Sequence, residues 1–208
     1  MYIDDRMLKK VKDHNSYHFL VYESSKTEVI LGRSCKEADD VNVENCQEDN
    51  ITVLRRAGGG GTVVLSQGII VISVAGISRV KYFLKEHMIT INERIISALR
   101  YFGVEGLSIK GISDIAIGDR KILGSSLYRR KDIVLYQGAL LVNPDMSIFE
   151  RYLKHPKREP DYRMGRPHRD FITSLYKERY EIPKSKIAES LEIRLGQGPP
   201  WISLMKNQ

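Results

Sequence analysis

Cysteine and long apolar runs are the features in which this sequence is poorest. Only two cysteines occur in 208 residues, Cys35 and Cys46, and they lie in a charged segment without the spacing of a metal site. No apolar stretch approaches the length that spans a bilayer, and the opening residues, MYIDDRMLKKVKD, have no signal-peptide core. These absences argue against a disulfide scaffold and a membrane span, and we expect a cytoplasmic, reduced protein.

Internal repeats and low-complexity linkers are also lacking. The 208 residues, 42% of them hydrophobic and 28% charged, suit one globular domain with a substantial core. We therefore expect residues 1–208 to form a single domain.

Basic residues outnumber acidic ones, and the formal net charge of +7 favours anionic partners such as phosphate ligands, nucleic acid or an acidic protein. Much of the excess lies in residues 151–169, called the basic segment below. It contains Arg151, Lys154, Lys157, Arg158, Arg163, Arg166 and Arg169 against Glu159 and Asp161. A second cluster spans residues 129–131. Each cluster is either an interaction surface or simply a solvated face, and the sequence leaves both interpretations open.

Strand and helix patterns alternate along the chain. Strands are expected at residues 17–24, 27–32, 51–56, 68–76 and 132–143, and residues 113–126 predict two strands joined by a turn at Gly118-Asp119. The run 68–76 is expected to be buried on both faces, and Gly138 to mark a β-bulge. Helices are expected near residues 39–48, at 80–102 before Gly103, after Asp145, and around Ile187, Leu191 and Leu195.

Strands outnumber helices in this pattern, and several of them are joined by tight turns. That arrangement argues against a doubly wound parallel sheet. The sequence therefore predicts an α+β (α/β) fold, a single domain with a mixed, mostly antiparallel sheet flanked by helices.

The stretch RRAGGGGTVV at residues 55–64 places four consecutive glycines between two predicted strands. Ordering four glycines is costly, so such a run serves either flexibility or a very close approach to the backbone. It is not a P-loop, because no Lys-Ser/Thr pair follows the glycines, and it does not open a helix as a dinucleotide-binding loop would. Backbone N–H groups could converge there on an anion, next to two arginines that suit phosphate or carboxylate. A ligand-binding loop and a flexible turn both remain open.

Three segments in this order resemble the signature of the lipoate–protein ligase and octanoyltransferase superfamily. They are RRAGGGGTVV, KGISDIAIGDRKILGSS (110–126) and YQGALLVN (136–143), and residues 163–175 resemble the basic stretch that follows in that family. The resemblance runs from about Thr27 to about Leu175. It implies the catalytic fold that this superfamily shares with biotin–protein ligases and, distantly, class II aminoacyl-tRNA synthetases.

The resemblance implies a ligase that uses ATP, with Mg²⁺ bound to the nucleotide, and lipoate or octanoate as the acyl substrate. The acyl carboxylate attacks the α-phosphorus and forms an acyl-adenylate, and a lysine of an acceptor carrier protein then takes the acyl group as an amide. Both steps build negative charge on oxygen atoms, where fixed N–H donors and a cation help most.

Residue roles follow from the same resemblance. Lys121 would be the catalytic cation at the acyl carbonyl and α-phosphate, although a lone lysine at this turn could equally be exposed and paired with Asp119. Asp114 would face ATP and magnesium, or simply start a strand. The remaining ligand-binding positions implied by the resemblance are Arg56, Gly58, Gly59, Gly60 and Gly61 in the loop, and Gly124 and Ser125 beside the acyl chain. No resident metal site is expected.

The sequence departs from the family pattern in three ways. Leu65 and Ser66 stand where family ligases usually carry a histidine-aspartate pair, and Ser113 stands where an asparagine often precedes the acidic residue. The chain also ends too soon after the basic segment for the C-terminal accessory domain of many ligases, so we expect none. A separate accessory subunit is therefore one expectation, and a compact ligase is the other.

Cysteine placement separates two enzyme classes. Octanoyltransferases of the superfamily form a thioester on a cysteine near the lysine motif or after the strand at 136–143, and neither place holds a cysteine here. The ligase hypothesis therefore leads, with an octanoyl or lipoyl transferase as an alternative. Cys35 and Cys46 are expected to be structural.

Two further alternatives lie outside catalysis by this chain. A relative that binds an acyl or adenylate ligand without turnover would also lack the histidine-aspartate pair. A basic nucleic-acid-binding module is the other, although aromatic residues are not interleaved with the basic runs as stacking would require. The family resemblance suggests instead that Arg158, Arg163, Arg166 and Arg169 attract an acidic lipoyl carrier domain.

Overall fold

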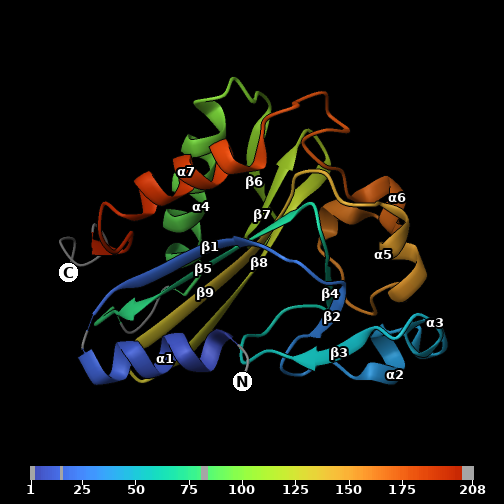
Figure 1. Ribbon diagram of the computed structural model, residues 1–208, viewed down its shortest axis with the longest axis horizontal. Helices are drawn as coiled ribbons and strands as arrows, with labels where there is room; N and C mark the ends of the chain where they lie inside the picture. Colours follow the sequence, from blue (N-terminus) through green and yellow to red (C-terminus); the bar gives the residue numbers. More distant parts are fainter. Residues whose placement is uncertain (1–2, 15, 81–83, 203–208) are drawn as a thin grey trace.

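The computed structural model describes residues 3–14, 16–80 and 84–202. These residues form a six-stranded antiparallel sheet beside a smaller three-stranded one (Figure 1). The strands of the large sheet are, in order, β1 (His18–Glu23), β5 (Ile69–Ile77), β9 (Ile133–Leu141), β8 (Arg120–Arg130), β7 (Asp114–Ile117) and β6 (Leu107–Lys110). The predicted mostly antiparallel sheet is confirmed.

The small sheet holds the ends of the glycine run. Its central strand β2 (Glu28–Leu31) pairs in parallel with β3 (Thr52–Arg55) and antiparallel with β4 (Val63–Leu65). The last residue of β3 lies opposite Leu31 and the first residue of β4 lies opposite Ile30. Residues 57–62, the glycine loop, therefore start and finish at the same end of β2, and a flexible interdomain linker is ruled out.

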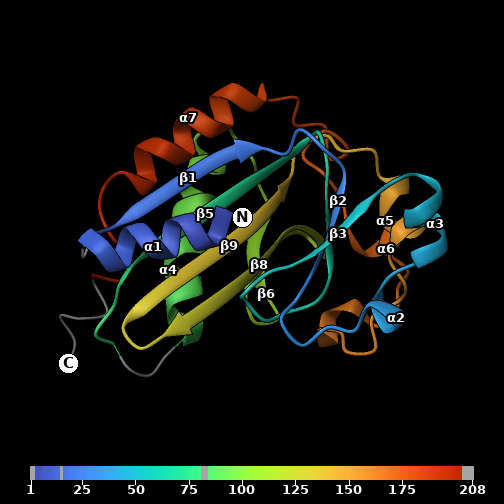
Figure 2. The ribbon, with the colours of Figure 1, turned by 60° about the horizontal axis from the view of Figure 1, so that its bottom comes forward.

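Helices cover both faces of the large sheet. Helices α4 (Leu84–Arg100) and α7 (Lys184–Leu195) pack on one face, and α1 (Ile3–His14) packs on the other (Figure 2). The predicted spacing holds in both long helices, where Ile91, Ile95, Leu99, Ile187, Leu191 and Leu195 are all fully buried. In β5, alternate residues face different cores, so the continuous apolar run is buried on both faces as predicted.

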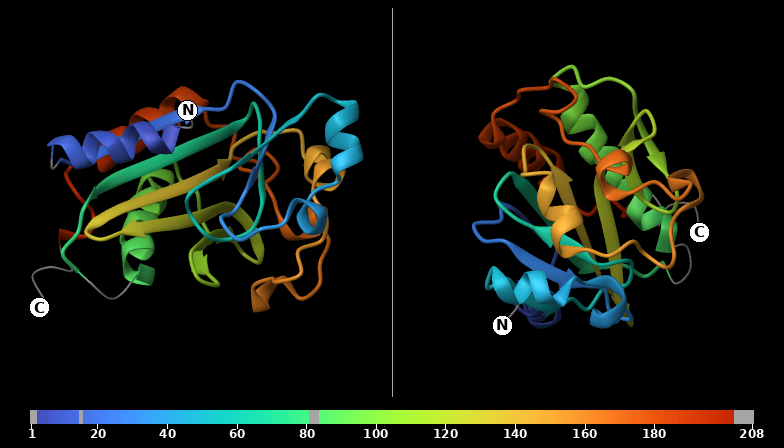
Figure 3. Two further views of the ribbon diagram at one scale, coloured as in Figure 1. Left: turned by 90° about the horizontal axis from the view of Figure 1, so that it is seen from below. Right: turned by 90° about the vertical axis from the view of Figure 1, so that its right-hand side faces the viewer.

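Four shorter helices gather at one end of the large sheet, away from α1 (Figure 3). They are α2 (Glu37–Asp40), α3 (Val43–Glu48), α5 (Ser147–Tyr152) and α6 (His168–Phe171), and the one-turn 3₁₀ helix η1 (Asp161–Arg163) precedes α6. The N-cap residue of α5 is Met146 and not Asp145 as expected, although the carboxylate of Asp145 accepts the N–H of Ser147, the first residue of the helix. This group of helices and the small sheet share a second apolar core.

Several predictions need correction. The helix expected at residues 39–48 is two helices, because Val41 leaves the helical path to bridge Leu153. Gly138 is not a bulge: its register is continuous on both sides, and a side chain there would meet the hydroxyl of Tyr136 at 2.8 Å. Helix α1 and strand β6 were not predicted, and Phe83, part of the pattern that predicted α4, lies outside the described residues. No helix in the described ranges is long and apolar enough to cross a membrane.

Candidate functional site

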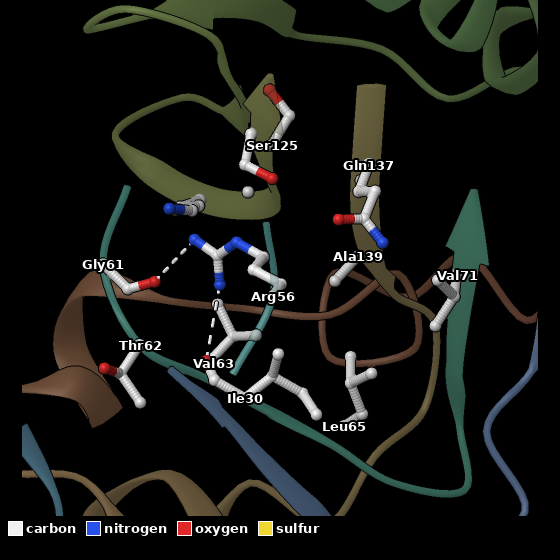
Figure 4. Close-up of a pocket in the computed structure, with 14 residues that line it drawn as sticks. Ile30, Arg56, Gly61, Thr62, Val63, Leu65, Val71, Ser125, Gln137 and Ala139 are labelled. Carbon is white, nitrogen blue, oxygen red and sulfur yellow. Dashed lines mark hydrogen bonds between the residues drawn. The ribbon is translucent and has the colours of Figure 1, made fainter. Parts of the chain in front are cut away.

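A cavity of about 120 Å³ lies between the two sheets, beside the glycine loop (Figure 4). Its lining residues are Ile30, Arg56, Gly61, Thr62, Val63, Leu65, Val71, Lys121, Gly124, Ser125, Ser126, Gln137, Gly138 and Ala139. One wall is aliphatic, and polar groups and the lysine occupy the other. The fold thus brings together five residues predicted for the site: Arg56, Gly61, Lys121, Gly124 and Ser125.

The carbonyl groups of the glycine loop are held by the protein. Those of residues 58–61 accept hydrogen bonds, in chain order, from the backbone N–H of Arg33 (2.9 Å), the Arg56 guanidinium (2.6 Å), the Cys35 thiol (3.4 Å) and Arg56 again (2.8 Å). Within residues 3–14, 16–80 and 84–202, no hydrogen bond is formed by the N–H groups of these four glycines. The loop is therefore ordered through its acceptors, and its donors stay available.

Arg56 lines the cavity and also holds the glycine loop. The residue is only 7% exposed, and its guanidinium donates to the carbonyls of Ile30, Gly59 and Gly61. Figure 4 shows the hydrogen bonds to Ile30 and Gly61 as dashed lines. Arg56 was predicted to bind a ligand, but it first binds the loop backbone, because fixed carbonyl groups already surround it. It still lines the cavity and adds positive charge to it.

Replacing Arg56 by lysine is expected to destabilise the fold by about 1–3 kcal/mol, since one ammonium group cannot satisfy three carbonyls that a planar guanidinium reaches. Urea denaturation followed by circular dichroism measures the change. Arg33→Lys is the matched control. Arg33 is exposed and contacts the loop through its backbone N–H, which the substitution keeps. Equal unfolding midpoints for the two variants would contradict the assignment.

The segment before α2 supports the loop from outside. A guanidinium nitrogen of Arg55 donates to the carbonyls of Gly32, Arg33 and Cys35. Gly32 lies so close to the loop that a Cβ atom built on it would be 2.0 Å from the carbonyl oxygen of Gly60. The glycine at position 32 is therefore required by close backbone approach, a role that TEVILG alone did not indicate.

Lys121 forms an ion pair with Asp114, with 2.8 Å between Nζ and Oδ1. The exposed-turn alternative is wrong, because Asp119 pairs with Lys110 instead. A shift in register between β7 and β8 places Lys121 opposite Ala116 and Leu123 opposite Ile115, so Ile122 is an additional residue in β8. This bulge changes the direction of the side chains at the point where β8 meets the cavity.

Gly124 leaves room for the lysine. A Cβ atom at this position would lie 2.8 Å from both Cε and Nζ of Lys121. The ammonium group therefore extends over Gly124 and along the cavity wall. The small residue that was predicted to line an acyl chain also accommodates the cation.

A buried hydrogen-bond network fixes the start of β7. The carbonyl of Ser113 accepts hydrogen bonds from the Asn92 amide (2.8 Å) and the Ser125 hydroxyl (3.0 Å). The hydroxyl of Tyr136 donates to the side-chain oxygen Oδ1 of Asn92 at 2.6 Å. Burial raises the pKa of Tyr136, so its hydroxyl stays protonated and remains a donor. Asp114 follows Ser113 directly, so this network sets the position from which its carboxylate meets Lys121.

The basic segment is only partly exposed. Arg158 and Arg169 are exposed, whereas Arg163 is buried and lies 4.8 Å above the ring of Phe171. Arg166 donates to the carbonyls of Tyr162 and Asp119. The prediction that Arg163 belongs to a surface patch therefore needs correction, because aromatic packing and Glu159 hold it inside.

Both cysteines are free thiols, and the environment of each disfavours ionisation. Cys46 is buried in the core of the small sheet, and Cys35 donates to the glycine loop. Burial raises the pKa of both thiols, and Asp40 raises that of Cys35 further. A raised pKa keeps these groups protonated at neutral pH, which is unfavourable for a nucleophile.

Several cavity residues were not predicted as site residues. They are Ile30, Thr62, Val63, Leu65, Val71, Ser126, Gln137, Gly138 and Ala139. Consecutive residues of one strand line the cavity, as Gln137, Gly138 and Ala139 do in β9, so the alternation of side chains along a strand does not identify them. Which residues border the cavity depends on how the two sheets pack. No group of three or more histidine, cysteine, aspartate or glutamate side chains within the described ranges could hold a metal ion.

Comparison with known proteins adds a family and a fold. The model of the lipoyl protein ligase A/B catalytic domain matches residues 1–193. Among curated proteins, the lipoate–protein ligase 1 of Plasmodium falciparum is 28% identical over 132 residues, which is 62% of this chain and 30% of that protein. The chain therefore matches less than a third of that relative's length.

Solved structures agree with the family match. The archaeal bi-partite lipoate protein ligase of Thermoplasma acidophilum, described with its E2 lipoyl domain, has a TM-score of 0.79 and 20% identity, covering 92% of this chain and 75% of that one. A lipoate-protein ligase A bound with ATP has a TM-score of 0.76 and 21% identity, covering 92% and 77%. At such identities the structural likeness concerns the fold, and it confirms the fold class predicted from the sequence.

Proposed function

Because this chain belongs to the lipoyl protein ligase A/B catalytic domain family, we propose that it activates lipoate, or a related medium-chain acyl acid, with ATP and transfers the acyl group to a lysine of a carrier domain. The first step forms a bond between the acyl carboxylate and the α-phosphorus and releases pyrophosphate. In the second, the neutral amine of the carrier lysine attacks the acyl carbonyl, loses a proton and releases AMP.

The observation that carries the proposal is the position of Lys121. Its ammonium group borders a cavity that has an aliphatic wall on one side and the glycine loop on another. The carboxylate and the α-phosphate are both anionic, and they repel each other as they meet. A fixed cation between them reduces that repulsion and stabilises the charge that builds up in the transition state.

The glycine loop supplies a second kind of stabilisation. Its carbonyls are engaged by Arg33, Cys35 and Arg56, so its free N–H groups are the donors that phosphate oxygens would meet. Donors that are already fixed need no reorganisation when charge develops. We propose that residues 58–61 contact the phosphate in this way, while Arg56 holds the loop and contributes its charge.

The aliphatic wall fits the acyl tail. It consists of Ile30, Val63, Leu65, Val71 and Ala139. Each buried methylene group contributes about 0.8 kcal/mol, so an eight-carbon chain gains much of its affinity here. Leu65 extends the apolar surface at the place where family ligases usually carry histidine. Nucleotide is expected to arrive as its Mg²⁺ complex, which makes the metal part of the substrate.

Lipoate-dependent exchange of labelled pyrophosphate into ATP tests the proposal. Exchange by the chain alone would support a compact ligase. If exchange appeared only with a second polypeptide, a bipartite enzyme would be supported. Inactivity in exchange combined with failure to transfer lipoate from synthetic lipoyl-adenylate to a lipoyl domain would contradict the proposed function.

The exposed arginines of the basic segment are proposed to attract an acidic carrier domain. Changing both Arg158 and Arg169 to glutamate is expected to lower kcat/KM for the carrier about tenfold at low salt, because electrostatic steering acts mainly on association. Adenylation should be unchanged. Arg130→Glu is the control, since Arg130 lies nine residues along β8 from Lys121, or roughly 30 Å. A transfer rate that does not respond to salt in the native protein would count against this surface.

A further inference from the structure

Asp114 is held from two sides. One carboxylate oxygen, Oδ1, is 2.8 Å from the ammonium of Lys121. The other, Oδ2, accepts a hydrogen bond of 2.8 Å from the hydroxyl of Tyr162. Tyr162 belongs to η1, in a part of the chain nearly fifty residues away from Asp114. Its hydroxyl reaches Asp114, the first residue of β7, because the basic segment folds back over the β7–β8 hairpin.

The ring of Tyr162 is itself fixed. It packs on Phe171 with a centroid distance of 5.0 Å, and it lies over Gly111 in the β6–β7 turn, where an added Cβ would be 3.5 Å from the ring. The ammonium of Lys110 lies 5.7 Å from the ring centroid. These contacts leave the ring little freedom to rotate. Burial and the neighbouring carboxylate raise the pKa of Tyr162, so its hydroxyl remains a donor at neutral pH.

The same part of the chain also holds the backbone around Lys121. Arg166 donates to the carbonyl of Asp119 in the β7–β8 turn, and the N–H of Thr173 donates to the carbonyl of Lys121 at 2.9 Å. The two carbonyls that accept these hydrogen bonds, of Asp119 and Lys121, flank Arg120 in the sequence. Residues 162–173 are therefore fixed to the strand that carries the lysine, and the hydroxyl of Tyr162 has a defined position relative to it.

We propose that Tyr162 is a positioning residue for adenylation: it orients the Asp114 carboxylate, which in turn holds the Lys121 ammonium at the cavity wall. The hydroxyl of Tyr162 donates to Asp114, and Tyr162 does not line the cavity beside Lys121, so its assigned role is to act through Asp114. A carboxylate bonded through one oxygen can rotate, and a lysine side chain has several rotatable bonds. Two opposed contacts on Asp114 remove that freedom. The inference rests on the proposed role of Lys121 in adenylation.

Tyr162→Phe tests this with the loss of one oxygen atom. We expect kcat for lipoate-dependent pyrophosphate exchange to fall about tenfold, the effect of losing one hydrogen bond to a charged group. The KM for lipoate should be nearly unchanged. Tyr152→Phe is a matched control, because its hydroxyl donates to a carboxylate of Asp49 at 2.7 Å, away from the cavity. The control should retain native kcat. A thermal melt of each variant checks that both are folded.

The variant Asp114→Asn distinguishes positioning from general destabilisation. If Tyr162 acts through Asp114, Tyr162→Phe has little further effect on kcat in the Asp114→Asn background. Additive losses would overturn the proposal, because they would mean that the two side chains act independently.

A readout that needs no substrate separates this inference from the proposed function. Competitive acetylation by acetic anhydride, quantified by mass spectrometry, measures the reactivity of Lys121 against Lys184 in the same sample. We expect Lys121 to react a few-fold faster in Tyr162→Phe and at the native rate in Tyr152→Phe, since a loosened ion pair frees the amine. Unchanged reactivity in Tyr162→Phe would overturn the inference. Faster labelling of Lys121 in a protein whose native form shows no exchange or transfer would support positioning while the proposed function fails.

Discussion

Lys121→Ala is expected to lower lipoate-dependent pyrophosphate exchange by about 10²–10³-fold, the usual effect of removing one preorganised group that stabilises transition-state charge. The loss should appear mainly in kcat, because the aliphatic wall and the glycine loop remain to bind substrate. Asp114 would keep its hydrogen bond from Tyr162 but lose its cation, so the variant also leaves an unpaired carboxylate next to the cavity. Initial rates of exchange at saturating ATP and lipoate measure the effect.

Lys186→Ala provides the control for this prediction. Lys186 is also a lysine paired with a carboxylate, but its partner is Glu189 on helix α7 and it does not line the cavity. Its loss is expected to change exchange less than threefold, as for most surface ion pairs. Equal rates for Lys121→Ala and the native protein would remove Lys121 from the mechanism.

Gly32→Ala is expected to have the second largest effect. The new Cβ would lie 2.0 Å from the carbonyl oxygen of Gly60 and 3.0 Å from its carbonyl carbon, and both are backbone atoms. The glycine loop must therefore shift as a whole, which breaks its alignment with Lys121. We expect a loss of stability of about 1–3 kcal/mol, as in overpacked cores, together with loss of any thermal stabilisation by the proposed substrates ATP and lipoate.

Gly59→Ala is the matched substitution within the loop itself. A Cβ at Gly59 meets no atom within 4 Å, so the free energy of unfolding should stay within about 0.5 kcal/mol of native. Any loss of activity in this variant would then report on the ligand and not on the fold. A Gly32→Ala protein with the native urea midpoint and native ligand response would show that the loop does not depend on this close approach.

Elements with strong local patterns were predictable. The run at 68–76 is apolar except for Ser73 and two glycines, as a strand covered on both faces requires, and such a run can be recognised without knowing which elements cover it. The turn at Gly118-Asp119 was equally predictable, because a glycine followed by aspartate between two apolar runs is typical of a hairpin. In the structure Gly118 adopts a positive φ of 57° there. Helix α1 was missed because it buries only a narrow stripe, including Met7 and Val11, under a mostly charged surface.

The candidate site was predictable only as a set of positions. The motif indicated Lys121 and the glycine loop but not the ion-pair partner of the lysine. Asp119 is nearer to Lys121 in sequence than Asp114 is, yet the structure pairs Lys121 with Asp114. A one-residue bulge in β8 changes which side chains share a face of the sheet, and no local sequence pattern predicted this bulge. The structural role of Arg56 was also not predictable, because the carbonyls that its guanidinium binds come from Ile30 and from the folded loop.

By itself, the sequence determined the fold class, the strands on either side of the glycine loop and the family to which the chain belongs, because those depend on residue order and short-range periodicity. Tertiary structure alone decided that Gly32 must be glycine, that Arg163 is buried, and that Tyr162 and Asn92 support the Asp114–Lys121 pair. Each of these depends on a contact between segments far apart in the chain. Such contacts exist only once the sheets have packed, since nothing local in the sequence specifies which distant backbone or side chain will lie within a few ångströms.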